Sequence, residues 1–315
     1  ESASVTLTGS NSGNLRFALN SVSTCGAVDS VSASIRSSFG KKSGSVNITS
    51  IDDESIVSGV RKSEEIAKLS PDKEEFMPPP EKQTGYVEVQ EYFEDTGSLT
   101  PQYISDRISY TINKAIDKDL TSAGYFESES GFFSIANTNK LSAYTKSSSA
   151  RFSSTIRTKE GNGSSKIDRS YADINLLDIK KLSDRVIDRA ILSKNPKKQE
   201  AGKYVTILDN AAVCDMIYNL SWYLNRRSAD EGRSFFSVKG KGNKIGEKIV
   251  SDKVIIYSDP QSKEAPSSPF NSEGIPLRKQ NWITNGVLNN LYCDRYWAKK
   301  SNSEFIPFPS NTIMQ

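Results

Sequence analysis

The chain has 315 residues, enough for about two domains, and its 36% hydrophobic content can supply a core while the surface stays polar. The 41 basic and 38 acidic residues give a formal net charge of +3, without a Lys/Arg block of the kind that binds nucleic acid. This charge pattern predicts that the chain does not bind nucleic acid. No apolar run approaches the roughly 20 residues of a transmembrane helix and no signal peptide is evident, so we expect no membrane partner either.

The side chains that most often build metal and redox sites are scarce. Cys25, Cys214 and Cys293 lie far apart without CxxC spacing, a pattern typical of reduced thiols, which predicts a cytoplasmic protein. The chain contains no histidine, so no imidazole can serve as a metal ligand or as the base of a hydrolase.

Residues 1–70 predict an N-terminal α+β domain. Their strands are expected at residues 3–8, 15–19, 28–38 and 45–49, with a turn at 11–14 and a glycine-containing hairpin loop at 39–44. A helix capped by Asp52 or Asp53 is expected to follow, and Ser70-Pro71 ends it. Its buried face is expected to contain Ile56, Val60, Ile66 and Ala67.

Residues 71–84 contain three consecutive prolines, Pro78 to Pro80, among several charges. This composition is typical of a semi-rigid linker, which we expect to stay unpacked and to mark a domain boundary.

Residues 85–196 predict a middle α+β domain. Thr100 and Pro101 supply an N-cap and a proline at the first helical position, and the helix that they open has an apolar face. Strands are expected at 124–137, 141–146 and 150–158, followed by a turn at 159–164 and a helix at 176–193. The plan of strands, hairpin and proline-ended helix repeats that of the first domain. We interpret it as a duplication of an antiparallel sheet-plus-helix unit, which predicts the α+β class.

Residues 197–315 are expected to form a β-rich C-terminal domain, and its first part carries the clearest pattern. Residues 204–208 form a short β-branched apolar run, which predicts a buried strand. Asp209 or Asn210 is the expected N-cap of a following helix. Apolar residues at three- and four-residue spacing predict its buried face: Val213, Met216, Ile217, Leu220, Tyr223 and Leu224.

Several segments, in one order along the chain, resemble the TldD/PmbA (TldE) family, once called modulators of DNA gyrase. They are Val205–Val213, Ala229–Phe235, Asp259–Pro260, Phe270–Pro276, Trp282–Leu288 and Tyr296–Lys300. The resemblance extends into the N-terminal half through Leu15–Asn20 and the proline-rich segment. It implies that the C-terminal domain is incomplete, because family members continue past the equivalent of Gln315.

In that family the TldD subunit is a metalloprotease whose helix carries His-Glu-x-x-x-His, and the TldE subunit lacks this motif. Neutral imidazoles hold Zn²⁺, an open coordination position holds water, and the glutamate takes the water's proton. One alignment places Asp209 and Cys214 at the histidine positions, and another places Asn210 and Asp215 there. Neither alignment supplies an imidazole or the glutamate. The resemblance therefore implies a zinc-less TldE-like subunit without a catalytic residue, a metal ligand or a cofactor of its own.

The resemblance also implies a function. We expect a subunit that is inactive alone and joins a zinc-bearing TldD-like metalloprotease, with which it encloses a chamber where small or unfolded peptides are degraded or processed. A peptide held regardless of its sequence is expected to lie extended along a strand edge. Two alternatives stay open: a stand-alone metallohydrolase that uses Asp209, Cys214 and Asp215 as ligands, and a homodimeric peptide-binding module.

Four residues are candidate contacts to peptide or partner. Asp230, Glu231 and Arg233 follow the predicted helix, and Arg can clamp a carboxylate. Trp297 stands beside two lysines, and Trp is favoured at interfaces. The alternatives are solvated charges after a helix and a tryptophan of the core.

Overall fold

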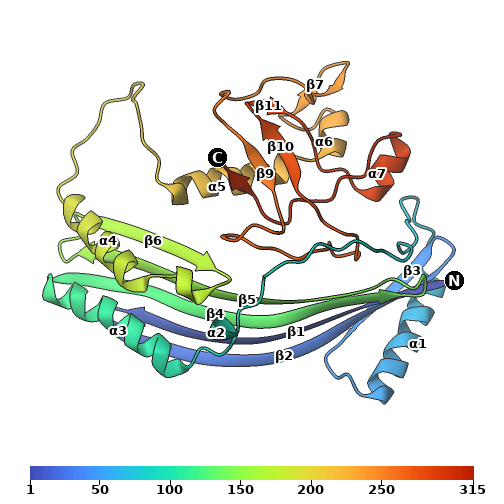
Figure 1. Ribbon diagram of the computed structural model, residues 1–315, viewed down its shortest axis with the longest axis horizontal. Coiled ribbons are helices and arrows are strands. Elements are labelled where there is room, and N and C mark those ends of the chain that lie inside the picture. Colours follow the sequence, from blue (N-terminus) through green and yellow to red (C-terminus); the bar gives the residue numbers. More distant parts are fainter.

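The computed structural model describes all 315 residues and contains one large antiparallel sheet of six strands (Figure 1). In spatial order the strands are β3 (Lys42–Ile48), β2 (Ser21–Phe39), β1 (Ser2–Ala18), β4 (Leu120–Asn137), β5 (Ser142–Thr158) and β6 (Ser164–Tyr171). The central strands β1 and β4 pair from Ser4↔Asn137 to Phe17↔Gly124. The α+β class is confirmed, and the duplication is visible as two sets of three strands, β1–β3 and β4–β6, which meet where β1 pairs with β4.

The sheet crosses a boundary that the sequence suggests. Sequence patterns separate residues 1–70 from residues 85–196, whereas their strands pair side by side along almost the whole length of β1. The two units therefore share one continuous hydrogen-bonded ladder.

Strand β1 is longer than predicted, because the turn expected at residues 11–14 does not form. These residues pair with β2 on one side and with β4 on the other, so two ladders hold turn-prone side chains in an extended conformation. The chain reverses instead at Leu19 and Asn20, both of which have positive φ. The Asn20 side-chain amide donates a hydrogen bond to the carbonyl oxygen of Leu120 at 2.8 Å, which ties the turn to β4.

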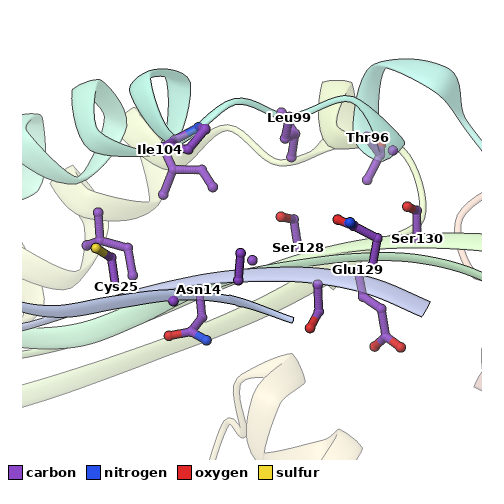
Figure 2. Close-up of a pocket in the computed structure, with 16 residues that line it drawn as sticks. Asn14, Cys25, Thr96, Leu99, Ile104, Ser128, Glu129 and Ser130 are labelled. Atoms are coloured by element: carbon purple, nitrogen blue, oxygen red, sulfur yellow. The ribbon is translucent and has the colours of Figure 1, made fainter. Parts of the chain in front are cut away.

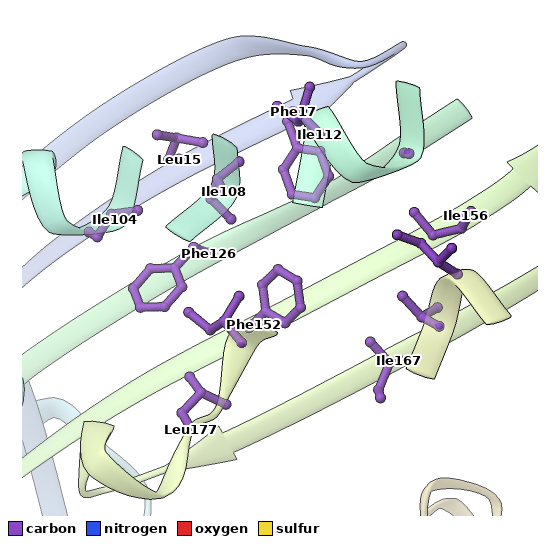
Figure 3. Packing of buried hydrophobic residues seen from close by; sticks show 14 of the residues in the cluster. Leu15, Phe17, Ile104, Ile108, Ile112, Phe126, Phe152, Ile156, Ile167 and Leu177 are labelled. Carbon is purple, nitrogen blue, oxygen red and sulfur yellow. The ribbon is translucent and has the colours of Figure 1, made fainter. Parts of the chain in front are cut away.

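Three long helices lie on one face of the sheet: α1 (Asp53–Leu69), α3 (Pro101–Asp117) and α4 (Ile179–Leu192) (Figure 1). A short helix α2 (Glu94–Gly97) and a 3₁₀ turn η1 (Ile174–Leu176) precede α3 and α4. The predicted N-cap is confirmed, since the Thr100 hydroxyl accepts a hydrogen bond from the Tyr103 N–H. The main core fills the space between the sheet and helices α3 and α4, where Figure 3 shows Phe126 and Phe152 of the sheet and Ile108 of α3.

Helix α1 packs differently from the prediction. Its N-cap is Asp52, as expected, but Ile56 and Ile66 are each 39% exposed. The buried residues are the small Gly59, Ser63 and Ala67. Small side chains let the helix backbone approach β3 closely, so apolar spacing alone does not identify its contact face.

The proline-rich segment is packed, which contradicts the expectation of a free linker. Asn137 and Asn139 donate side-chain hydrogen bonds to the carbonyl oxygens of Pro80 and Pro79, at 2.9 and 2.8 Å. Glu75 forms an ion pair of 2.7 Å with Arg227 in the C-terminal part. The segment therefore follows the sheet and connects it to the C-terminal unit.

The C-terminal unit lies on the opposite face of the sheet (Figure 1). Its helices are α5 (Asn210–Tyr223), α6 (Arg226–Asp230) and α7 (Arg295–Lys300). Its short strands are β7 (Ser237–Val238), β8 (Gly242–Asn243), β9 (Ile256–Ser258), β10 (Gln280–Thr284), β11 (Val287–Leu288) and β12 (Ile313–Met314), of which four form a sheet in the order β11-β10-β9-β12. A separate core around Trp282, Ile283 and Phe236 stabilises the unit.

The strand predicted at residues 204–208 is wrong. These residues have no regular secondary structure, and Val205 and Ile207 are almost fully exposed. Helix α5 forms as predicted, but Ser221 is its only buried residue, whereas Met216 and Tyr223 of the predicted inward face are about 60% exposed. The apolar composition of residues 204–208 and of α5 predicted that these side chains are buried, whereas they are largely exposed in this chain. None of the helices combines the length and the apolar character needed to cross a membrane.

Candidate site at the start of helix α5

Asp209 is one of the two residues that the alignments place at the first histidine of the zinc motif, and its carboxylate is fully engaged with protein groups. It caps α5 by accepting a hydrogen bond from the Asn210 N–H at 3.0 Å. Its two oxygens also accept hydrogen bonds from Arg185 at 3.1 Å and from Arg189 at 2.6 Å, both of which belong to α4. These contacts hold the first turn of α5 against the last turns of α4.

The two arginines decide the electrostatics of this position. The hydrogen bond from Arg189 lowers the pKa of Asp209 below its ordinary value, and this effect outweighs partial burial, which acts in the opposite direction. The carboxylate is therefore ionised and neutralised by cations of the protein. A metal ion placed here would meet two guanidinium groups at close range, which repel it.

The remaining positions of the zinc motif do not form a site with Asp209. The Asn210 side-chain oxygen accepts hydrogen bonds from Arg169 and from the Ala211 N–H. Cys214 and Asp215 are exposed on α5. No three side chains among Cys, Asp and Glu gather anywhere in the chain at a spacing that could hold a metal ion. A guanidinium-paired carboxylate, an amide and an exposed thiol do not fit the donor set of a protease zinc ion.

A broad apolar groove of about 710 Å³ lies beside α5. Ile217, Tyr218 and Trp222 of the helix line one side, and Phe308 and Met314 line the other. Trp222 and Phe308 contact each other with ring centroids 5.5 Å apart, yet Trp222 is 60% exposed. A tryptophan that is exposed to this degree within an apolar surface is typical of residues that become buried on association.

The four candidate contact residues fall into two groups. The Trp297 indole N–H donates to the Asp230 carboxylate at 2.9 Å, and Asn243 donates to the same carboxylate at 2.6 Å. Trp297 is only 8% exposed, so these contacts join α6 to α7 inside the unit. Glu231 instead forms ion pairs at the surface with Arg227 and Arg233, and the hydrogen bond from Arg233 lowers its pKa. Contact of these residues with a peptide or a partner stays a prediction.

Sequence reasoning missed Glu91, which precedes α2. Burial raises its pKa to about 7, and its Oε2 atom is buried without a hydrogen-bond partner. Glu91 lines a polar pocket of about 340 Å³, between the sheet and the C-terminal unit, together with Glu129 and Glu264. An isolated glutamate in a Tyr- and Phe-containing segment carries no local signal of this burial, because the pocket is formed by segments far apart in the sequence.

A large antiparallel sheet, covered by helices on one face and by a β-rich unit on the other, defines the class of this chain: an α+β protein. Residues 201–307 match the family described as PmbA/TldA metallopeptidase C-terminal domain. Those residues therefore belong to the PmbA/TldD family, and the chain as a whole has the fold of TldE.

The fold assignment comes from three solved structures that cover all of this chain. TldE from Thermococcus kodakarensis matches with a TM-score of 0.87 and 18% identity over 74% of its own length. Proposed modulators of DNA gyrase from Thermotoga maritima MSB8 and Bacteroides thetaiotaomicron VPI-5482 match with TM-scores of 0.88 and 0.87. Their identities are 17% and 19%, and 73% of each is covered. A comparison with curated proteins finds no significant match.

Proposed function

We propose that this chain is the non-catalytic, TldE-type subunit of a TldD/TldE-type zinc metalloprotease complex, and that the complex degrades or processes small or unfolded peptides. The zinc ion belongs to the TldD-like partner, and the complex acts in the cytoplasm, where Cys25, Cys214 and Cys293 stay reduced. The chain itself supplies shape and association.

The observation that carries this proposal is the state of Asp209. In one of the two alignments, Asp209 stands at the first histidine of the family's protease motif, and its carboxylate is bound to Arg185 and Arg189. In this chain the carboxylate caps helix α5 and accepts two ion pairs. Such a helix can be retained for its position in an assembly after the metal ligands are lost.

The exposed apolar residues around α5 support association with a partner. Val205 and Ile207 precede the helix in full exposure, and Met216, Tyr218 and Trp222 are each about 60% exposed on it. Monomeric proteins seldom leave a contiguous apolar surface of this kind in contact with water. Binding of a partner subunit over α5 would bury these side chains, which explains why they are apolar.

The test is to co-express the chain with the TldD-like protein of the same genome that carries His-Glu-x-x-x-His. The two chains should elute together in size-exclusion chromatography, and the complex should contain zinc and cleave denatured casein until a chelator is added. The isolated chain should neither retain stoichiometric zinc nor cleave. Chelator-sensitive cleavage by the isolated chain, or recovery of self-pairs only, would overturn the proposal in favour of the stand-alone hydrolase or the homodimeric module.

The apolar surface can be tested by the double substitution Trp222→Ser and Met216→Ser. Because these side chains are largely exposed in the isolated chain, the variant should fold normally but elute apart from the TldD-like subunit. Leu69→Ser is the matched control, since Leu69 is 88% exposed at the end of α1, far from α5 along the fold. Equal complex formation by both variants would exclude α5 from the interface.

A further inference from the structure

We propose that the open edge of β2, from Ser21 to Val31, binds an extended peptide and takes one of its large apolar side chains into the cavity beneath α3. The inference deepens the proposed function by naming where and how this subunit holds a peptide.

The first observation is an unpaired strand edge. β3 covers β2 only from Ala33 to Phe39, whereas β1 pairs with β2 along its whole length. The residues of β2 before Val31 therefore form no main-chain hydrogen bond except those to β1. Every residue from Ser21 to Ser30 is exposed. This stretch has no proline and no lysine, its one charge is Asp29, and its one β-bulge lies at Ser23, near its start. From Thr24 to Val28 it therefore lacks the features that normally protect an edge from pairing.

The opposite side of the sheet shows the contrast. β6 pairs with β5 only as far as Ala150, so the start of β5 pairs with β4 on one side and has no strand on its outer side. There the chain supplies a cover: the Ser148 N–H donates to the Glu91 carbonyl oxygen, and the Phe93 N–H donates to the Ser148 hydroxyl, both at 2.9 Å. The β2 edge has no equivalent cover.

The second observation is a cavity of about 380 Å³ whose wall includes this edge. Figure 2 shows Cys25 on the side of the sheet that faces Leu99 and Ile104, whereas Asn14 points away. Cys25 pairs with Leu15 and Ala27 pairs with Gly13, so both edge residues face the cavity. A strand added beside β2 would alternate in the same way and direct every second side chain towards this space.

The size of the cavity identifies the occupant. A second copy of β2 would present residues such as Cys25 and Ala27 there, and these side chains are too small to fill 380 Å³ lined by Leu15, Leu99 and Ile104. A peptide with leucine or phenylalanine at alternate positions fills it and buries apolar surface as well as pairing with the edge. Backbone pairing accepts any sequence, and the cavity adds a preference for a large apolar residue.

The ligand test uses the full chain and a short fluorescein-labelled peptide of alternating threonine and leucine, followed by fluorescence anisotropy. Replacing the leucines by alanine should weaken binding by about tenfold or more. Two further peptides carry N-methyl groups on alternate backbone nitrogens, one on every threonine and the other on every leucine. Only one set of N–H groups can point towards β2, so one peptide should bind and the other should not. If both N-methylated peptides bind, or if neither does, the proposed strand pairing is wrong.

The protein test compares Ala27→Trp with Val28→Trp. Both residues are exposed, but Ala27 faces the cavity and Val28, which pairs with Ser12, faces the other side. The first variant should weaken binding by about tenfold, and the second should leave it nearly unchanged. Bound peptide should also slow maleimide labelling of Cys25 but not of Cys214. Equal binding by both variants overturns the proposal, as does a dimer in sedimentation that Ala27→Trp disperses.

The two proposals fail separately. If the β2 edge binds no peptide while the zinc-dependent complex still forms and cleaves, the edge site is wrong and the subunit role stands. If the isolated chain cleaves by itself, the subunit role is wrong whatever the edge binds.

Discussion

Asp209 links the start of helix α5 to helix α4. Its carboxylate caps α5 and receives two guanidinium groups, and both tasks need an ionised oxygen acceptor. The cap could be predicted from the sequence, because Asp before an apolar helical pattern is a local signal. The arginines could not be predicted, since they lie 24 and 20 residues earlier in the chain and meet Asp209 only through the packing of α4.

We predict that Asp209→Ala lowers the free energy of unfolding by about 1 kcal/mol at pH 7 through the lost cap. Asp209→Asn should cost less, because an amide oxygen can still cap the helix. Since its contacts lower the pKa of Asp209, the stabilising effect of the carboxylate is present above the ordinary carboxyl pKa and is lost as the pH falls through the lowered value. Urea unfolding at neutral and acidic pH measures this. A variant of normal stability that abolishes cleavage by the complex would contradict a purely structural role.

Glu91 has the opposite pH dependence. Its folded-state pKa of about 7 lies above the ordinary value of 4.5, so the folded protein binds more protons than the unfolded chain between these values, and stability falls as the pH rises through that range. Glu91→Gln should remove this dependence and raise the free energy of unfolding at pH 8 by about 1–2 kcal/mol, allowing for partial solvation. Thermal unfolding at pH 5 and pH 8 checks it. An unchanged difference between the two pH values would show that Glu91 titrates normally.

At the scale of elements, amphipathic helices were the most predictable part of the fold. α3 and α4 bury the apolar faces that their sequences indicate, because these helices pack on a wide sheet. The long strands were less predictable. Residues 11–14 and 146–150 are rich in Ser, Asn and Gly, which are typical of turns, yet ladder hydrogen bonds hold them within β1 and β5. For residues 204–208 the error was the opposite one: their apolar composition predicted a buried strand, but the segment is exposed.

The contact between α1 and β3 gives a prediction about close packing. A Cβ atom at Gly44 would lie within van der Waals radii of the Ser63 carbonyl oxygen and the Ala67 nitrogen, both of which are helix backbone. Gly44→Ala should therefore lower the free energy of unfolding by about 1–3 kcal/mol through overpacking. Gly26→Ala is the control, because its Cβ would meet only the Asn14 side chain at an ordinary 3.6 Å. Chemical denaturation of both variants measures the difference in their free energies of unfolding. Equal stabilities would mean that α1 can move away from the sheet at little cost.

At the scale of the whole molecule, the C-terminal unit is attached to the sheet by more than the chain that leads into it. Phe270 packs with Ile135, Leu141 and Ala143 of the sheet region, and Tyr86 joins this cluster. The Tyr86 hydroxyl also donates to the Gly274 carbonyl oxygen at 2.8 Å. The segment after the prolines thus connects the C-terminal unit to the sheet, a role that its composition did not predict.

This attachment predicts the result of limited proteolysis. The connection between α4 and α5 runs away from the rest of the molecule in Figure 1, and it contains the exposed Lys197, Lys198 and Lys203. Trypsin should cut there first, because exposed irregular chain is the preferred substrate. The two fragments should still elute together under native conditions, since the Phe270 cluster and the Glu75–Arg227 ion pair remain. Fragments that separate on a gel-filtration column would show that the covalent connection is what holds the unit in place.

The pairing of β1 with β4 has a consequence for how such a protein can be divided. A fragment that ends at residue 84 would keep β1, β2 and β3 but would lose the partner of β1, leaving that strand open from Ser4 to Phe17. An unprotected border of this length recruits other strands and leads towards amyloid-like stacking. Gene fission or domain shuffling between the two repeats is therefore disfavoured, while insertions at residues 194–209 leave every ladder intact.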